Sequence, residues 1–124
     1  MRVERVLSFD EIKHVAPLAP EFFPQNQETM NNCYVFIVDD FCYVGFRALK
    51  HHPTIAEVMM RKDFKKNGSL NSSLFKFVLK LTKQFGFERM ALFAINDRLK
   101  NIYLKKGWVE LWGNGWLVSK ESMV

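Results

Sequence analysis

The sequence contains no apolar run of the roughly 20 residues that a membrane-spanning helix needs. Its first residues, MRVERVLSFDEIK, lack the apolar segment of a secretory signal. We therefore expect a soluble, cytoplasmic protein with no membrane partner.

Cysteine is scarce, since Cys33 and Cys42 are the only two in 124 residues. They form no CxxC pair and have no histidine at ligand spacing, so we expect buried free thiols and no metal site. The adjacent His51 and His52 would point apart on an extended chain, which suits a shared metal badly.

Aromatic residues and positive charge are plentiful by contrast. The 12 Phe, 3 Trp and 3 Tyr indicate a core packed with rings. The net charge of +5 suits an anionic ligand, whether nucleic acid, a phosphorylated cofactor or an acidic partner. A chain of 124 residues can bury one core but not two, so we predict a single domain over residues 1–124.

The N-terminal part is predicted to begin with a strand over residues 2–7. Ser8 and Glu11 have the spacing of a capping box, which predicts a helix that Pro17 ends. Residues 17–32 contain three prolines and are predicted to form a loop or a broken helix.

The rest of the chain alternates strands and helices. We predict a hairpin over 33–49, a strand over 54–61, a basic loop over 62–69, a helix over 70–85, a strand over 87–95, a helix over 96–107 and a hairpin over 108–119. The hairpins pair antiparallel, whereas the strand–helix–strand unit pairs parallel. The fold class is therefore α/β, with a mixed central sheet flanked by helices.

The basic loop is the first candidate for chemistry. Lys62, Lys65, Lys66, Asn67 and Gly68 stand between a strand and the start of a helix. Backbone N–H groups at a helix start are unpaired and the helix dipole is positive there, so a pyrophosphate would fit. The alternative is an ordinary solvated loop.

Glu57 is the second candidate, because it is a carboxylate in an otherwise apolar strand. In a cleft beside apolar groups, desolvation would raise its pKa towards the range of a general base. Alternatively it lies on a solvent face or pairs with Arg47 or Arg61.

The third candidate lies in residues 96–108, NDRLKNIYLKKGW, where Tyr103 precedes Gly107 by four residues. A tyrosine on a helix is usually a packing residue. The spacing of Asn96, Tyr103 and Gly107, with Trp108 in place of Phe, resembles the penultimate segment of the GNAT superfamily of acetyl-CoA-dependent N-acetyltransferases. The hairpin YVFIVDDFCYVGFRAL and the run IAEV resemble the second to fourth strands of that family.

The resemblance implies a function: transfer of an acetyl group from acetyl-CoA, as co-substrate, to a primary amine of a small molecule or protein. It implies that Glu57 is the general base and Tyr103 the general acid near the sulfur. The residues that it implies for binding the cofactor are Met59, Met60, Arg61, Lys66, Asn67, Gly68, Ser69 and Asn96.

One stretch departs from the family. Its glycines before the long helix let the backbone close around the CoA pyrophosphate, but here neither is in register and Asn71 replaces the second. This departure favours an alternative: an inactive GNAT-fold binding or structural protein, similar to short GNAT-like proteins of tailed bacteriophages. Nucleic-acid binding is the least favoured class, because the chain has no recognition motif. The sequence leaves open whether the protein forms a homodimer.

Overall fold

The computed structural model describes residues 2–18, 20, 23–63, 65–68, 72–93, 97–110 and 116–119. The chain divides into two compact units. Unit 1 comprises Met1–Arg47 with Met59–Ser72, and unit 2 comprises Ala48–Val58 with Ser73–Val124. Each unit is described by itself below.

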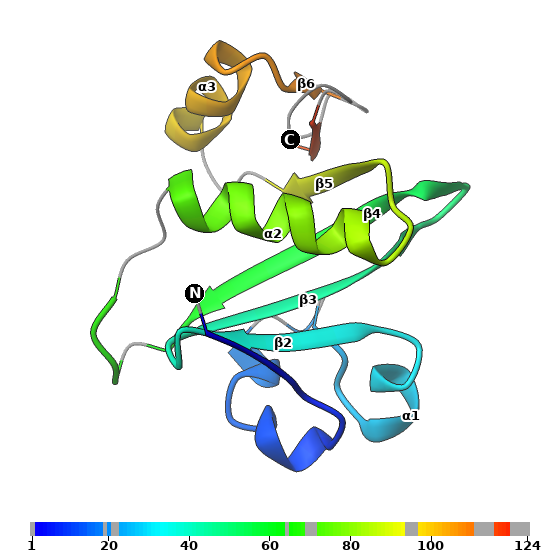
Figure 1. The fold of residues 1–124 in the computed structure, drawn as a ribbon, viewed down its shortest axis with the longest axis vertical. Coiled ribbons are helices and arrows are strands. Elements are labelled where there is room, and N and C mark those ends of the chain that lie inside the picture. The colour runs from blue at the N-terminus through cyan, green and yellow to red at the C-terminus, as the bar shows by residue number, and fades with distance from the viewer. Residues whose placement is uncertain are drawn as a thin grey trace. The chain divides into compact units, whose positions relative to one another are not determined.

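Unit 1 is built on antiparallel strands (Figure 1). Strand β1 (Val3–Arg5) pairs with β2 (Tyr34–Val38), which pairs with β3 (Cys42–Leu49). The predicted hairpin is therefore confirmed. Its turn contains Asp39 and Asp40, with φ values of 51° and 62°. Aspartate tolerates this left-handed conformation better than most residues, which explains the pair in the turn.

The predicted capping box does not form. In place of a continuous helix from Ser8 to Pro17, the chain makes two 3₁₀ turns, Phe9–Glu11 and Ala16–Leu18. The side chain of Ser8 makes no capping bond. The N–H of Glu11 donates instead to the carbonyl of Ser8 at 3.1 Å. The side chain of Gln27 accepts the N–H of Phe9 at 2.6 Å and donates to the carbonyl of Leu7 at 2.9 Å.

Gln27 begins a short helix, α1 (Gln27–Met30), inside the segment predicted as a loop or a broken helix. The side chain of Asn26 caps this helix by accepting the N–H of Thr29 at 2.8 Å. The segment then packs on the strands of unit 1. The buried members of this core are Val6, Ile12, Val15, Ala16, Phe23, Met30, Val35 and Tyr43.

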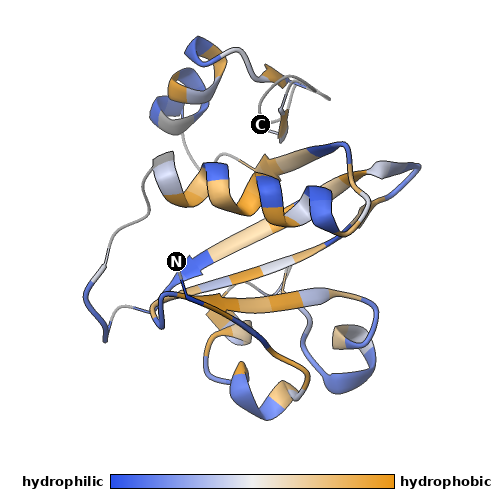
Figure 2. Ribbon diagram, viewed as in Figure 1, coloured by the Kyte–Doolittle hydropathy of each residue, from blue (hydrophilic) through white to orange (hydrophobic). Residues whose placement is uncertain are grey.

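Unit 2 contains the helices and strands of the C-terminal part. They are α2 (Ser72–Gln84, of which Ser72 belongs to unit 1), β5 (Arg89–Phe93), α3 (Asp97–Lys105), β6 (Val109–Glu110) and β7 (Trp116–Val118). Figure 2 shows α2 as hydrophobic along one side and hydrophilic along the other, as its periodicity predicts. Strands β6 and β7 pair antiparallel, which confirms the terminal hairpin.

Strand β4 (His52–Lys62) contributes residues to both units. It pairs parallel with β5, and β5 pairs antiparallel with β7. The hydrogen-bonded order of the strands is β1-β2-β3-β4-β5-β7-β6. The predicted mixed sheet in an α/β fold is therefore confirmed. No helix in the described ranges is long and apolar enough to cross a membrane.

Candidate active site

Glu57 lies at the end of the parallel ladder between β4 and β5. Among the described residues, this ladder joins three pairs, and the last is Glu57 opposite Ala91. Strand β4 continues to Lys62 and β5 to Phe93. The ladder therefore stops beside the one carboxylate that β4 carries.

Apolar residues flank Glu57 in the strands of unit 2. Ile55, two residues earlier on β4 and so on the same face, packs in a cluster with Leu49, Ala91 and Val118. Glu57 is half-buried rather than fully exposed. Glu57 therefore lies on the same face of β4 as a buried apolar cluster.

Tyr103 lies on α3 and is only 8% exposed. Its ring contacts Phe75 of α2 in a T-shaped arrangement at 5.7 Å and Trp108 at 5.0 Å between centroids. Burial raises the pKa of Tyr103 to about 12. The phenol therefore stays protonated at neutral pH.

The backbone explains why this tyrosine stands four residues before a glycine. Gly107 has a φ of 92°, its N–H donates to the carbonyl of Leu104, and the N–H of Trp108 donates to that of Tyr103 at 3.1 Å. These bonds make a Schellman motif, in which the residue after the glycine packs on the residue that starts the last turn. Tyr103 and Trp108 are this pair, and their ring contact lies at the end of α3.

The strand registers place Glu57 and α3 on opposite faces of the sheet in unit 2. Glu57 pairs with Ala91, and Ala91 pairs with Val118, so the three share one face. Glu110 pairs with Leu117, the neighbour of Val118, and so points to the other face.

On that other face, Lys100 of α3 forms an ion pair with Glu110. The hydrogen bond to Glu110 is the main cause that raises the pKa of Lys100. Helix α3, which carries Tyr103, is thereby tied to the face opposite Glu57. Because Glu57 and the helix of Tyr103 lie on opposite faces, a bound molecule could contact both side chains only where the sheet is interrupted. The β4–β5 ladder ends next to Glu57.

The basic loop of unit 1 follows β4. The N–H of Asp63 donates to the carbonyl of Phe41 at 2.7 Å, and the N–H of Lys65 donates to the Asp63 carboxylate at 3.0 Å. Lys66 and Gly68 are exposed, and Gly68 has a φ of 143°. The loop therefore presents lysines to solvent from a backbone fixed at its start.

The other residues implied for cofactor binding are distributed as follows. Met59, Met60 and Arg61 lie half-buried on β4, Asn67 is exposed in the loop, and Ser69 and Asn96 lie outside the described residues, as does Asn71, which replaces the family's second glycine. Met59 and Arg61 alternate with Met60 along the strand, so they share the face of Glu57 by strand geometry.

The two cysteines are free thiols. Cys42 is fully buried, and burial raises the pKa of its thiol to about 12. Cys33 is only half-buried, and its thiol donates to the carbonyl of Thr29 at 3.5 Å. Within the described ranges, no group of three or more potential metal ligands assembles.

Sequence reasoning missed Phe41. It follows the Asp39–Asp40 turn, and a Cβ built on Gly68 would lie 2.6 Å from its ring. The signal was a large apolar ring in a hairpin turn, where polar residues are the norm.

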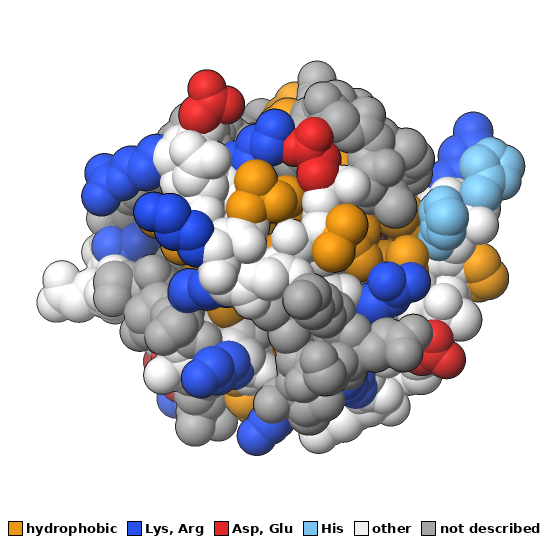
Figure 3. Space-filling view, turned by 90° about the horizontal axis from the view of Figure 1, so that it is seen from above, with side chains coloured by type: hydrophobic (Ala, Val, Ile, Leu, Met, Phe, Trp, Pro, Cys, Tyr) orange, Lys and Arg blue, Asp and Glu red, His pale blue; other side chains and the backbone are white. Residues whose placement is uncertain are grey.

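Basic side chains are spread over the surface. Figure 3 shows lysine and arginine side chains of the described residues exposed on the surface.

No protein-family model and no curated protein matches the chain, but solved structures do. Mutant forms of the spermidine/spermine N-acetyltransferase SpeG from Vibrio cholerae match with a TM-score of 0.62 at 14% identity, over 94% of this chain and 90% of that one. An aminoglycoside 6'-N-acetyltransferase complexed with coenzyme A matches with a TM-score of 0.61 at 12% identity, over 98% and 97%. A GNAT-family acetyltransferase from Streptococcus pneumoniae gives 0.54 at 15%, over 96% and 97%. The chain therefore has the fold of the GNAT acetyltransferases.

Proposed function

We propose that the protein is an acetyl-CoA-dependent N-acetyltransferase that acts on a primary amine of a small molecule or a protein. The observation that carries the proposal is the end of the β4–β5 ladder beside Glu57, with Tyr103 on a helix tied to the opposite face. Two proteins of this fold are named for amine substrates, and one is complexed with coenzyme A.

In the proposed reaction the amine nitrogen attacks the thioester carbon, and the carbon–sulfur bond breaks. Glu57 accepts the proton that the amine loses, directly or through a water. A backbone N–H near Met59 or Met60 donates to the carbonyl oxygen as negative charge develops there. The electron pair of the broken bond leaves on the sulfur, which must then gain a proton.

Tyr103 is proposed to stabilise that sulfur. Its pKa of about 12 lies well above the value of roughly 8.5 for an ordinary thiol. Complete proton transfer from the phenol to the thiolate is therefore uphill, whereas a hydrogen bond from the phenol is always available at neutral pH. We accordingly assign Tyr103 as a hydrogen-bond donor to the leaving thiolate, with solvent as the final source of the proton.

The cofactor is proposed to reach the loop after β4 with its phosphates. Lys66, Asn67 and Gly68 are exposed there, and lysine is a common phosphate ligand. Met59, Met60 and Arg61 would line the pantetheine path along β4, and Ser69 and Asn96 complete the proposed set.

Thermal unfolding with and without acetyl-CoA tests the proposal. Ligand at a hundred times its Kd should stabilise the protein by about 2.7 kcal/mol. No shift at millimolar acetyl-CoA would overturn the enzyme assignment. Given a shift, Tyr103→Phe should lower turnover and leave the shift nearly intact, whereas equal loss of both would make Tyr103 only a packing residue.

A second candidate is a GNAT-fold protein that binds a partner without transferring acetyl groups. The departure of the basic loop from the family's glycine pattern favours it, because Asn71 stands where the family has its second glycine. An acetyl-CoA shift without turnover on any of a panel of polyamines, aminoglycosides and lysine peptides would select this candidate.

A further inference from the structure

The turn of the β2–β3 hairpin touches the basic loop of unit 1 at both ends of its described part. At the start of the loop, the N–H of Asp63 donates to the carbonyl of Phe41 at 2.7 Å. At the end, Gly68 lies against the same residue, since its missing Cβ would stand 2.6–2.7 Å from three ring carbons of Phe41. One residue therefore contacts the loop twice.

Between these two contacts the loop is turned on itself. The N–H of Lys65 donates to the carboxylate of Asp63 at 3.0 Å, and the N–H of Lys66 donates to the carbonyl of Asp63 at 3.1 Å. Both bonds depend on Asp63, which Phe41 holds. The two lysines that would meet the phosphates thus stand on a backbone anchored by Phe41.

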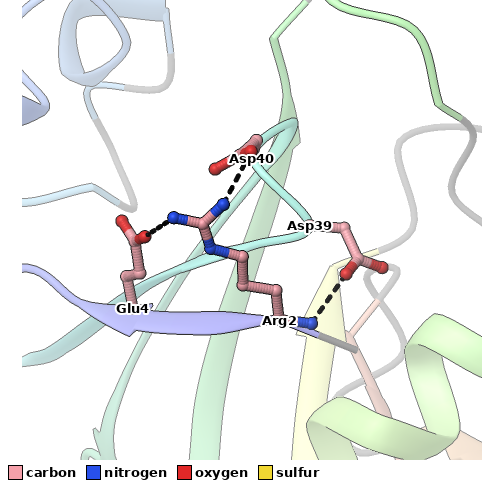
Figure 4. A network of polar contacts seen from close by, with 4 residues as sticks. All are labelled: Arg2, Glu4, Asp39 and Asp40. Carbon is pink, nitrogen blue, oxygen red and sulfur yellow. Dashed lines mark hydrogen bonds and ion pairs between the residues drawn. The ribbon is translucent and has the colours of Figure 1, made fainter.

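The turn itself is fixed by the N-terminal strand (Figure 4). The N–H of Arg2 donates to the carboxylate of Asp39 at 2.8 Å, and the N–H of Asp39 donates to the carbonyl of Arg2 at 2.7 Å. The guanidinium of Arg2 adds ion pairs to Glu4 at 2.7 Å and Asp40 at 3.6 Å. Phe41 therefore follows a turn that is bonded to the backbone of Arg2, the residue before β1.

The glycine at position 68 follows from this packing. Its φ of 143° is one that side-chain-bearing residues rarely adopt, and a methyl group would collide with the ring. Gly68, one of the residues that the resemblance implies for cofactor binding, is thus also a glycine that the Phe41 ring requires.

We propose that Phe41 is a positioning residue that orders the loop around Lys65 and Lys66 for the phosphates of CoA. This inference rests on the proposed function and adds to it a residue that need not touch the ligand. A loop ordered before binding does not lose its conformational freedom when the ligand arrives, so its affinity for phosphate is higher.

The experiment compares wild type with Phe41→Ala on two acetyl donors, acetyl-CoA and acetyl-pantetheine, which lacks the pyrophosphate. We expect the variant to raise KM for acetyl-CoA roughly tenfold with kcat nearly unchanged, because two or more side chains must be ordered on binding. Turnover of acetyl-pantetheine should not change. Equal loss on both donors would overturn the positioning role.

Limited trypsin digestion of the unliganded protein gives a readout that does not depend on activity. Trypsin cuts after lysine, and Phe41→Ala should accelerate cleavage after Lys65 and Lys66 several-fold, since a freed loop fits a protease more readily. Unchanged cleavage would overturn the inference even if the proposed function stands. Wild type that binds no CoA would overturn the proposed function, and the digestion would still decide whether Phe41 orders the loop.

Two matched variants guard against general destabilisation. Phe41→Leu keeps an apolar side chain and should show a smaller effect of the same kind if Phe41→Ala folds poorly. Leu7→Ala truncates a side chain that is 70% exposed and should leave both KM and cleavage unchanged. A change of cleavage in Leu7→Ala as large as that in Phe41→Ala would count against a specific role for the ring.

Discussion

Gly107 and Gly68 both have a positive φ and an aromatic partner, but the partners come from different distances along the chain. At Gly107 the rings are Tyr103 and Trp108, within one helix end. At Gly68 the ring belongs to Phe41, from another hairpin. Gly107 ends a helix, whereas Gly68 leaves space for an aromatic ring from a turn that is distant in the sequence.

The difference shows that a glycine at a candidate site can be required for either of two structural reasons. A Schellman glycine is needed by its own helix whatever lies around it. The glycine in the basic loop is needed because a neighbour occupies the space of its side chain. Only the second links the candidate phosphate loop to the rest of unit 1.

Removing the ring at the helix end should have the largest effect. Trp108 is 8% exposed, and Trp108→Ala should lower the free energy of unfolding by about 3–5 kcal/mol, as for other buried aromatic truncations. Urea denaturation measures it. A loss under about 1 kcal/mol would show that the Tyr103–Trp108 contact does little for the end of α3.

Filling the space at Gly68 should have the next largest effect. Gly68→Ala combines an unfavourable φ with a collision against Phe41, and we expect a loss of roughly 2–4 kcal/mol. Gly86→Ala is the matched control, because Gly86 has a φ of 95° with no atom within 4 Å of the added Cβ. It should lose only about 1 kcal/mol, the conformational part.

The double variant Gly68→Ala with Phe41→Ala separates the two causes at Gly68. If the ring causes part of the loss, the alanine at position 68 should cost less in the Phe41→Ala background than in wild type. If the losses of stability in the two single variants simply add in the double variant, the collision with the Phe41 ring is relieved without strain.

The helix end could be predicted from sequence and the loop could not, for a physical reason. All the determinants of the Schellman motif lie between Tyr103 and Trp108, so their spacing is visible in one short stretch. The partner of Gly68 is set by the β2–β3 turn and its pairing with β1, which no local pattern encodes. The capping box at Ser8 did not form, since the N–H of Glu11 donates to the carbonyl of Ser8 rather than to its side chain.

Part of the candidate site could likewise be predicted from the sequence, and part could not. The apolar run around Glu57 predicted its place on a strand, and the helix that Gly107 ends predicted the place of Tyr103, whereas their catalytic roles were implied by the family resemblance. The end of the β4–β5 ladder beside Glu57 depends on how two strands diverge, which sequence periodicity does not record. That end is the feature on which the proposed function depends.

Alkaline pH should weaken the helix end selectively. Burial raises the pKa of Tyr103 to about 12 from an unfolded value of 10.0, so the folded state holds this proton more tightly. Its stabilising contribution is complete below pH 10 and is lost as pH rises through about 12. The loss should be on the order of 2–3 kcal/mol.

Urea denaturation across this pH range, with Tyr103→Phe as the reference, isolates that contribution. The variant cannot ionise at this position, so it should lose less stability than wild type while Tyr43 and Cys42 titrate in both. Parallel losses in the two proteins would mean that Tyr103 ionises with an ordinary pKa.

The smallest effect is expected at the turn that carries Phe41. Arg2→Ala removes ion pairs to Glu4 and Asp40, in which the side chain of Arg2 is 67% exposed. Such exposed pairs contribute up to about 1 kcal/mol and are screened by salt, so the loss should vanish near 1 M NaCl, where the Debye length is about 3 Å.

The backbone bonds between Arg2 and Asp39 do not need the side chain and should survive the substitution. Trypsin cleavage after Lys65 and Lys66 should therefore stay at the wild-type rate in Arg2→Ala. Faster cleavage would show that the guanidinium, rather than the backbone, fixes the turn and through it the loop.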